Sequence, residues 1–524
     1  MEAKQTPLWH PGLWIALAAG LALKAVILAT GAATFDADEA ILALMARHTL
    51  QGEPALFFYG QNYMGALDAY LIAGSFLAFG ERVLSVRLTQ VMLYAGVLVT
   101  TYILAWRITE DRWAAAAAGG LIALPTVLFS TYTTATLGNY VEVLLINNLL
   151  FLIVWDILSG RSDKPVWWLV AGLLAGIGWW GMALVIVAIA PLALLGLWHY
   201  RESLPWQRIA LLVAGFAVGA LPWFAGIIGS PTGILADLSG ARVVDPGGGF
   251  GPRVVSLLLF NLPALFGLRA PWSASFILLP VGVVALAGIL LVLVDSVRGW
   301  SAGTDYQRIA RRTLLIAFAV LCVLFTATRF GIDPTGRYLL HLYPPLVLLI
   351  ADWMHRMRPR QAALALSLPL ILGGYYLYGN IQAIMNTPPG LTTQFDPVTH
   401  IPHTHDDDLV AFLDAIGVDR GYSNYWVAYR FAFQTGERII LSPALPDKTD
   451  LAYTPSYDRY PAYTDEVNAA DEVVYITSNL PQLDAELARR FDVLDVSYRV
   501  EDIGPYTVFY DLSRAVRPAE LGGW

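Results

Sequence analysis

The sequence predicts a polytopic α-helical membrane protein of about eleven spans, followed by a small α/β domain at the C-terminus. Of the 524 residues, 56% are hydrophobic and only 14% are charged, a balance too apolar for a water-soluble protein. Apolar runs of spanning length also recur along the chain. The formal net charge is −8 and the pI is about 5.5. This acidic balance gives no basic footprint for nucleic acid, which is therefore excluded as a partner.

Eleven apolar runs are long enough to cross the hydrocarbon core of a bilayer, which takes about 20 helical residues. The first run exceeds the apolar core of a cleavable signal peptide, so we expect the chain to retain it as an anchor. The runs are residues 12–34, 83–106, 113–131, 139–157, 165–180, 182–198, 208–228, 273–295, 313–330, 338–352 and 361–379.

Basic residues cluster in short connections between these runs, and the positive-inside rule makes those connections cytoplasmic. A shorter apolar stretch, residues 66–80, decides the rest of the topology. The later spans alternate consistently, with a cytoplasmic N-terminus, only if this stretch does not cross. We therefore expect it to form an interfacial helix along the outer leaflet. The basic connections hold Arg107 and Arg112, Arg161 and Lys164, Arg201 and Arg208, Arg298 with Arg308, Arg311 and Arg312, and Arg356 with Arg358 and Arg360.

In this topology the outer side carries four segments: residues 36–82, the loop 230–272, the turn 329–337 and all residues after 380. Composition changes after Asn380, where Asp, Tyr, Pro and Thr replace Leu and Ala. We therefore divide the chain into a transmembrane domain, residues 1–380, and a soluble extracytoplasmic α/β domain, residues 381–524.

The apolar patterns of the C-terminal domain predict two helices and four strands. The helices are expected over residues 408–416 and 483–491, and the strands over 438–441, 472–477, 497–501 and 506–511.

Three carboxylates, Asp36, Asp38 and Glu39, directly follow the first apolar run. A carboxylate at the bilayer centre costs about 2.5 to 3.5 kcal/mol, so such acids lie at an interface or line a watery cavity and are functional candidates. The apolar residues that follow predict a short amphipathic helix over 38–47, which Asp36 or Asp38 would cap. A cap needs one acid, so three acids within four positions favour chemistry.

Aromatic residues alternate with glycine and amide side chains in the segment 54–68, which contains Tyr59, Gln61, Tyr63 and Asp68. One interpretation is an aromatic belt at the membrane interface. The other is a wall that binds a sugar ring and a lipid chain, because Tyr and Gln supply hydrogen bonds while Phe supplies apolar contact. The composition alone leaves both interpretations open.

Charged residues also occur inside or at the ends of later spans. Glu142 lies about one turn into its span, where a carboxylate either faces a cavity or is bonded locally. Arg337, followed by Tyr338, opens a late span on the outer side. Its guanidinium suits bidentate binding of a phosphate, and the alternative is a lipid-headgroup anchor. Lys24 lies deep in the first apolar run, where a charged side chain needs a polar partner that the sequence does not identify.

His400, His403 and His405, followed by three aspartates, resemble a metal site in residue type. The histidines lack a fixed helical spacing, so we interpret the segment as a linker that ends in an acidic helix start. No metal is predicted there.

Three motifs together resemble the GT-C superfamily of membrane glycosyltransferases, in its protein-O-mannosyltransferase and aminoarabinose-transferase branch. These motifs are the Asp38-Glu39 pair after the first span, the Tyr-Gly-Gln-x-Tyr-x-Gly segment that starts at Tyr59, and the Arg-Tyr-Leu segment that starts at Arg337. The resemblance covers about residues 1 to 380. It implies transfer of a sugar from a polyprenyl-phosphate carrier to an extracytoplasmic acceptor, with inversion at the anomeric carbon.

The resemblance also implies roles for single residues. Asp38 matches the catalytic base of the relatives, with Glu39 beside it, and Glu142 matches an acid found at the start of their fourth span. Relatives of the aminoarabinose type carry an arginine where this chain has Ile41, so Arg337 or another outer-face base must bind the phosphate. Metal use varies among the relatives, and no metal is assigned.

The sequence thus predicts a glycosyltransferase of the plasma membrane, with a polyprenyl-phosphate sugar donor, membrane lipids as surroundings and an unidentified acceptor. The alternatives are a transporter or flippase of a polar lipid, and a non-catalytic protein that binds a cell-surface polymer. The predicted catalytic residues are Asp38 and Glu39, and the predicted substrate-binding residues are Asp36, Tyr59, Gln61, Tyr63, Asp68, Glu142, Arg337 and Tyr338.

Overall fold

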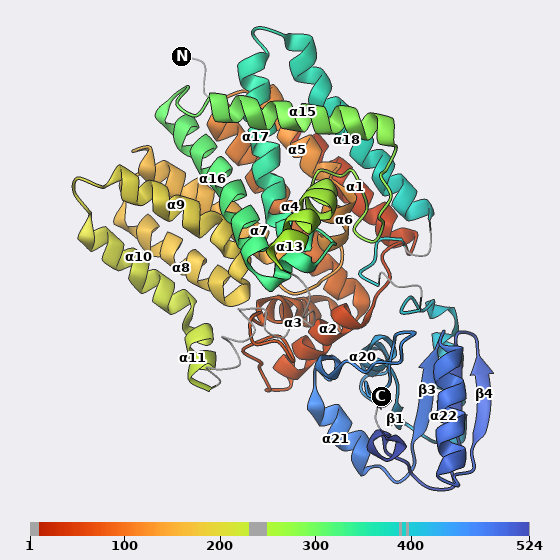
Figure 1. The fold of residues 1–524 in the computed structure, drawn as a ribbon. Helices are drawn as coiled ribbons and strands as arrows, with labels where there is room; N and C mark the ends of the chain where they lie inside the picture. The colour runs from red at the N-terminus through yellow and green to blue at the C-terminus, as the bar shows by residue number, and fades with distance from the viewer. Residues whose placement is uncertain (1–9, 230–248, 387–389, 395–397, 523) are drawn as a thin grey trace. The chain divides into compact units, whose positions relative to one another are not determined.

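The computed structural model describes residues 10–229, 249–386, 390–394, 398–522 and 524. These residues form two compact units (Figure 1). The first unit contains residues up to Ala33, Asn62–Asp68 and Arg87–Leu391, and the second contains Thr34–Gln61, Ala69–Val86 and Thr392–Trp524. The beginning of the predicted outer loop, residues 230–248, lies outside the described residues.

The first unit is helical (Figure 1). Every predicted apolar run overlaps one or more of its helices. The longer helices are α1 (Pro11–Ala29), α4 (Val83–Thr109), α5 (Arg112–Ala123), α7 (Tyr140–Leu158), α8 (Pro165–Gly181), α9 (Ile186–His199), α10 (Trp206–Gly219), α15 (Leu279–Arg298), α16 (Asp305–Ala327), α17 (Tyr343–Met357) and α18 (Ala362–Met385). The shorter ones are α6 (Val127–Tyr132), α11 (Leu221–Gly229), α13 (Phe250–Ser256) and α14 (Leu262–Leu265).

Six of the described helices are long and apolar enough to cross a membrane, and α10 with α11 makes a seventh span if this pair, bent by 58°, is counted as one. The predicted count of eleven spans is therefore not confirmed. The predicted run 113–131 is not one helix, because α5 ends at Ala123 and α6 begins after Pro125 with Thr126 as its N-cap. Proline has no backbone N–H to continue a helix, which explains the break.

Many large apolar side chains on these helices are exposed, as expected where a helix faces lipid rather than water. Examples are Trp14 and Ile15 on α1, and Val283 and Val284 on α15. Together with the apolar helices of spanning length, they identify an integral membrane protein.

Helices α8 and α10 lie side by side in close contact (Figure 1). Glycines make the approach possible, because a Cβ on Gly172 would come within 2.0 Å of the Leu212 carbonyl oxygen and one on Gly215 within 2.2 Å of the Leu169 carbonyl oxygen. Each helix repeats the glycine four residues later, at Gly176 and Gly219. Small residues at this spacing let membrane helices pack backbone to backbone.

The stretch 66–80 forms helix α3 (Leu67–Phe79), which has 13 residues. At a rise of about 1.5 Å per residue it is about 20 Å long, shorter than a hydrocarbon core of about 30 Å. The interfacial placement of this stretch stays a prediction, because helices of predicted spans, such as α9 with 14 residues, are about as short.

The second unit contains helix α2 (Ala37–Leu50) and a five-stranded mixed sheet in the order β2-β1-β3-β5-β4. Strand β1 pairs in parallel with β2 and β3, whereas β5 pairs antiparallel with β3 and β4. The strands are β1 (Arg420–Tyr422), β2 (Ile440–Ser442), β3 (Val474–Ser478), β4 (Arg499–Ile503) and β5 (Tyr506–Tyr510), and the helices around them are α19 (Asp406–Ile416), α20 (Tyr425–Gln434), α21 (Pro461–Ala469) and α22 (Pro481–Val493).

Both helices and all four strands predicted in this domain are present, with ends shifted by up to two residues. Strand β1 and helices α20 and α21 were not predicted. Helix α2 is also not amphipathic as expected, because eleven of its 14 residues are buried, including those on its polar positions. The reason is tertiary: α20 packs along α2, and the Phe433 ring lies 5.6 Å from that of Phe35.

Candidate active site

The acid cluster lies at the N-terminus of α2, in the second unit. Asp36 is the N-cap, since its Oδ1 accepts hydrogen bonds from the backbone N–H of Asp38 at 3.1 Å and of Glu39 at 3.3 Å. Capping therefore accounts for Asp36, one of the three acids, and Asp38 and Glu39 remain in the first turn. Their charge is favourable there, because the positive end of a helix dipole stabilises carboxylates.

Asp38 is held by hydroxyl groups from far along the chain. The Tyr425 hydroxyl donates to Asp38 Oδ1 at 2.6 Å. The Thr393 hydroxyl lies 2.9 Å from Asp36 Oδ2 and 3.4 Å from Asp38 Oδ2. A hydroxyl carries one proton, so the shorter distance assigns the Thr393 donor mainly to Asp36. Tyr425 is thus the principal donor to Asp38, whose side chain is half-buried.

Glu39 is fully buried, at 0% exposure. A general base must come within hydrogen-bond distance of the group that it deprotonates. Of the two predicted catalytic acids, the half-buried Asp38 fits this requirement better. The role of Glu39 stays a prediction.

Aromatic and basic side chains surround Tyr425. The Tyr457 ring stacks on it with centroids 4.6 Å apart, and the Arg459 guanidinium lies 5.9 Å from its centroid. Arg459 also lies against Gly60, where a Cβ would come within 2.9 Å of the arginine Cδ. Gly60 has φ +69°, a left-handed conformation that favours glycine. The first loop thus leaves room for a cation of the C-terminal domain.

Tyr59, predicted as substrate-binding, has its hydroxyl 2.8 Å from His48 Nδ1. The other nitrogen of His48 lies 2.8 Å from Glu437 Oε1, and Arg47 pairs with the same carboxylate at 3.1 Å. Burial opposes ionisation of Glu437, but hydrogen bonds from His48, Tyr463 and Arg47 outweigh it and lower the pKa of Glu437 to about 2. This cluster ties α2 to the C-terminal domain. The backbone of Gln61 closes a turn on Phe58 at 2.9 Å.

The first unit contains a second acidic group, Asp68 with Glu142. Asp68 is fully buried and accepts hydrogen bonds from Gln90 at 3.0 Å and from the Thr136 hydroxyl. Glu142, in the first turn of α7, is 3% exposed and interacts with the Asp68 carboxyl group. Neither side-chain oxygen of Glu142 has a hydrogen-bond partner within the described part of the chain, so burial alone does not show that Glu142 is bonded locally. Its role stays a prediction.

Asn139 places this acid pair. Its Oδ1 accepts the Asp68 N–H at 3.0 Å, and its Nδ2 donates to the carbonyl oxygens of Gly65 at 2.6 Å and Gly181 at 3.1 Å. Asn139 itself adopts a left-handed conformation with φ +61°, which asparagine tolerates better than most residues.

Arg337 lies in the first unit beside Asp333, with which it forms an ion pair at 2.7 Å. It also donates to the Tyr338 hydroxyl at 3.3 Å. The Phe330 ring lies 5.0 Å from that of Tyr338 and 6.2 Å from that of Tyr63. Three predicted substrate-binding residues, Tyr63, Arg337 and Tyr338, are therefore brought together around Phe330.

Lys24 has polar partners inside the helices. Its Nζ donates to the hydroxyls of Thr133 at 2.6 Å and Thr134 at 2.7 Å, and to the Ser130 carbonyl oxygen at 3.1 Å. These three acceptors satisfy the three N–H groups of an ammonium, so Lys24 is explained as a structural residue.

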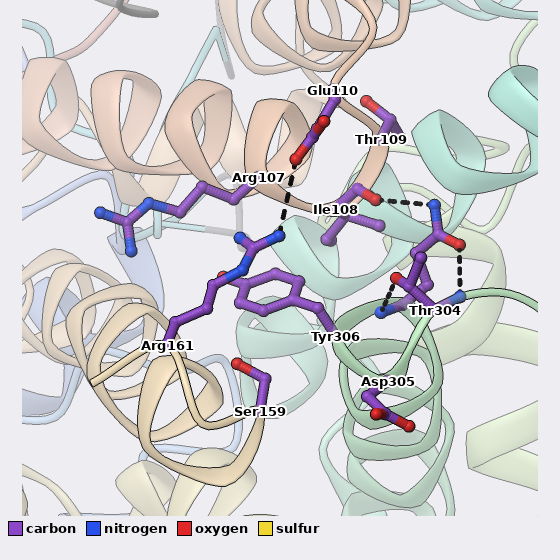
Figure 2. Close-up of a pocket in the computed structure, with 10 residues that line it drawn as sticks. Arg107, Ile108, Thr109, Glu110, Ser159, Arg161, Thr304, Asp305 and Tyr306 are labelled. Atoms are coloured by element: carbon purple, nitrogen blue, oxygen red, sulfur yellow. Dashed lines mark hydrogen bonds and ion pairs between the residues drawn. The ribbon is translucent and has the colours of Figure 1, made fainter. Parts of the chain in front are cut away.

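Figure 2 shows a different pocket of about 360 Å³ in the first unit, between the ends of α4 and α7 and the start of α16. Arg161 lies over the Tyr306 ring there, 4.0 Å from its centroid, and pairs with Glu110 at 3.6 Å. Gln307 donates to the Ile108 carbonyl oxygen at 3.0 Å. The residues that line this pocket include none of those predicted for the site, and its arginines belong to connections predicted to be cytoplasmic.

Sequence reasoning missed Tyr425, Arg459, Gln90 and Asn139. An aromatic run that includes Tyr425, Trp426 and Tyr429 was the one signal for the first of these. Its link to Asp38, 387 residues earlier, has no trace in spacing or periodicity.

No family model and no curated protein matches the sequence. Solved structures do match the fold. ArnT from Cupriavidus metallidurans bound to undecaprenyl phosphate is 11% identical, with a TM-score of 0.58 over 95% of this chain and 98% of that one. The same protein in the apo state is 12% identical, with a TM-score of 0.59 over 93% and 97% of the two chains. An oligosaccharyltransferase of Archaeoglobus fulgidus gives 14% identity and a TM-score of 0.48 over 89% and 69%. Both ArnT structures match over almost their full length, so this chain shares their fold.

Proposed function

We propose that this protein is an inverting glycosyltransferase that moves a sugar from a polyprenyl-phosphate-linked donor to an extracytoplasmic acceptor. The observation that carries the proposal is the half-buried Asp38 carboxylate, held at a helix N-terminus by the Tyr425 hydroxyl. The fold supports it, because one of the similar structures, ArnT, holds undecaprenyl phosphate.

In the proposed reaction, an acceptor hydroxyl oxygen attacks the anomeric carbon from the side opposite the lipid phosphate. The new carbon–oxygen bond forms while the bond to the phosphate oxygen breaks, and that electron pair leaves with the lipid phosphate. Asp38 takes the proton of the attacking hydroxyl as a general base. Attack opposite the leaving group inverts the anomeric configuration.

The test is a transfer assay with the purified full-length protein in liposomes. Polyprenyl phosphates that carry different radiolabelled sugars are the donors, and an extract of cell-envelope lipids, glycans and proteins supplies the acceptor. We expect one donor to lose its label to a product of inverted configuration while free polyprenyl phosphate accumulates. Folded protein that releases no polyprenyl phosphate from any donor contradicts the proposal.

Arg337 is proposed to bind the donor phosphate. Replacing it with Gln should lower kcat/KM for the donor by about 10- to 100-fold, because a hydrogen bond to a charged group contributes about 1.5 to 3 kcal/mol. The kcat/KM of Arg337→Lys should lie between those of the wild type and Arg337→Gln, since lysine keeps the charge but lacks the bidentate fork of arginine. Steady-state kinetics over a donor series measure this effect.

The matched control for Arg337 is Arg499→Gln, which removes an exposed arginine from strand β4 and should leave the kinetics unchanged. Equal kinetics for Arg337→Gln and the wild type would assign the phosphate to another base, with Arg337 serving as an anchor for Asp333.

The C-terminal domain is proposed to be extracytoplasmic, in line with the positive-inside rule. Asp407→Cys, made in a Cys322→Ala background that has no other cysteine, should react with a membrane-impermeant maleimide on intact cells. Glu202→Cys, in a basic connection predicted to be cytoplasmic, should react only after permeabilisation. The reverse pattern would contradict the proposed orientation.

A further inference from the structure

Tyr425 is held rigidly by the sheet of the C-terminal domain. It is the first residue of α20, whose N-cap is Asn424. The Asn424 side chain accepts the Val427 N–H at 3.2 Å and donates to Ser478 Oγ of strand β3 at 2.8 Å. Stacking on Tyr457 and an edge contact with Trp426 complete the packing, and Tyr425 is only 1% exposed. The hydroxyl thus has a defined position.

The hydroxyl of a buried tyrosine needs an acceptor, because an unpaired polar group costs free energy in a low-dielectric interior. Here the acceptor is Asp38 Oδ1 at 2.6 Å, within the range of about 2.5 to 2.7 Å for a hydroxyl bound to an anion. Burial and the negative charge of Asp38 raise the pKa of Tyr425 well above its usual value. The hydroxyl therefore remains a donor at physiological pH.

The two oxygens of Asp38 differ as a result. Oδ1 is occupied by the strong donor Tyr425, whereas Oδ2 has only the longer 3.4 Å contact with the Thr393 hydroxyl. Oδ2 is consequently the oxygen that remains available to accept a proton.

We propose that Tyr425 is a positioning residue for the base: it binds Oδ1 and presents Oδ2 to the acceptor hydroxyl. The inference rests on the proposed function and gives the C-terminal domain a part in the chemistry. A domain that only covered the transmembrane helices would not require a hydroxyl directed at this acid.

Other charged and titratable groups also lie near Asp38. Asp36 and Glu39 lie beside it at the start of α2. In the C-terminal domain, Tyr457 interacts electrostatically with Asp38, and the Arg459 guanidinium lies over the Tyr425 ring. A change at Tyr425 leaves these groups in place, so it isolates the hydroxyl.

The test compares Tyr425→Phe with Tyr429→Phe. Both remove one hydroxyl from the same helix, but the Tyr429 hydroxyl accepts the N–H groups of Arg459 at 2.6 Å and Tyr460 at 3.0 Å instead of binding Asp38. Tyr425→Phe should lower kcat by about 10- to 100-fold, the effect of one hydrogen bond to a charged group, with little change in the KM for the donor. Tyr429→Phe should keep the wild-type kcat.

The pH profile of kcat is the second readout. A carboxylate that loses a hydrogen-bond donor protonates more easily, so the acid limb should move to higher pH in Tyr425→Phe and stay in place in Tyr429→Phe. A purely structural role for Tyr425 would lower the amount of folded enzyme without moving this limb.

Two further variants keep the outcomes separate. If Tyr425→Phe has a wild-type kcat and pH profile while Asp38→Asn is inactive, the inference is wrong and the proposed function stands. If Asp38→Asn is fully active, the proposed function itself is wrong. Should Tyr425→Phe fail to fold, difluorotyrosine at position 425 keeps the ring and strengthens the donor. The acid limb should then move to lower pH, and an unchanged limb would overturn the inference.

Discussion

Asp38→Asn should lower kcat for sugar transfer by about 10²- to 10⁴-fold, the range that general-base catalysis contributes. Asparagine has nearly the same shape, and its amide oxygen can still accept the hydrogen bond that Tyr425 donates to Asp38 at 2.6 Å. It cannot take the proton of an acceptor hydroxyl. Donor binding should therefore survive, and the loss should appear in kcat rather than in KM, as single-turnover and steady-state transfer assays would measure.

Asp407→Asn is the matched control, because it makes the same chemical change in the first turn of another helix, α19, of the same unit. It should retain wild-type transfer. If Asp38→Asn also retains it, the chain is better explained as a non-catalytic protein that binds a cell-surface polymer. Movement of labelled lipid across liposomes without any bond cleavage would instead favour the flippase.

Among the substitutions proposed for this protein, Asp352→Asn should cause the largest loss of stability. Asp352 on α17 binds Arg311 on α16 through two hydrogen bonds, at 2.8 and 2.9 Å, and both side chains are about 1% exposed. The amide leaves the guanidinium charge buried without its counter-ion, which costs about 3 to 5 kcal/mol. The variant should therefore unfold at a clearly lower temperature in detergent, as followed by circular dichroism.

Asp163→Asn tests whether burial of the ion pair causes the loss of stability in Asp352→Asn. Asp163 also pairs with an arginine, Arg208, but its side chain is 77% exposed, and exposed ion pairs contribute little. Its unfolding temperature should match the wild type. The double variant Arg311→Met with Asp352→Leu should recover part of the loss, because it removes both charges at once. If Asp352→Asn and Asp163→Asn lower the unfolding temperature equally, the buried ion pair contributes no more stability than the exposed one, and the prediction is wrong.

Much of the second unit was predictable because its elements have local patterns. The continuous apolar and β-branched run around Val474–Ser478 and the acidic start of Asp406–Ile416 indicate a strand and a helix without help from the rest of the chain. Strand Arg420–Tyr422 was missed because its three residues include a charged side chain and a glycine, so no apolar run marks it. The burial of α2 on all sides was missed because α20, which covers it, lies almost 400 residues along the chain.

The acidic residues show the same division. The sequence alone identified the acid trio and predicted a helix cap there, and the structure assigns that cap to Asp36. It also indicated Glu142 as a carboxyl group within an apolar helix. That Asp68 is its partner, and that Gln90 and Thr136 complete the group, depends on how four separate segments pack.

Composition and periodicity by themselves determined that this is a membrane protein, where most of its helices lie and that an acid caps the start of α2, because each of these depends on neighbouring residues. Only the tertiary structure decided that Tyr425 binds Asp38 and that Lys24 is satisfied by threonines. Such contacts depend on side-chain directions and on chain closure over long separations. A linear pattern of residue types does not encode them.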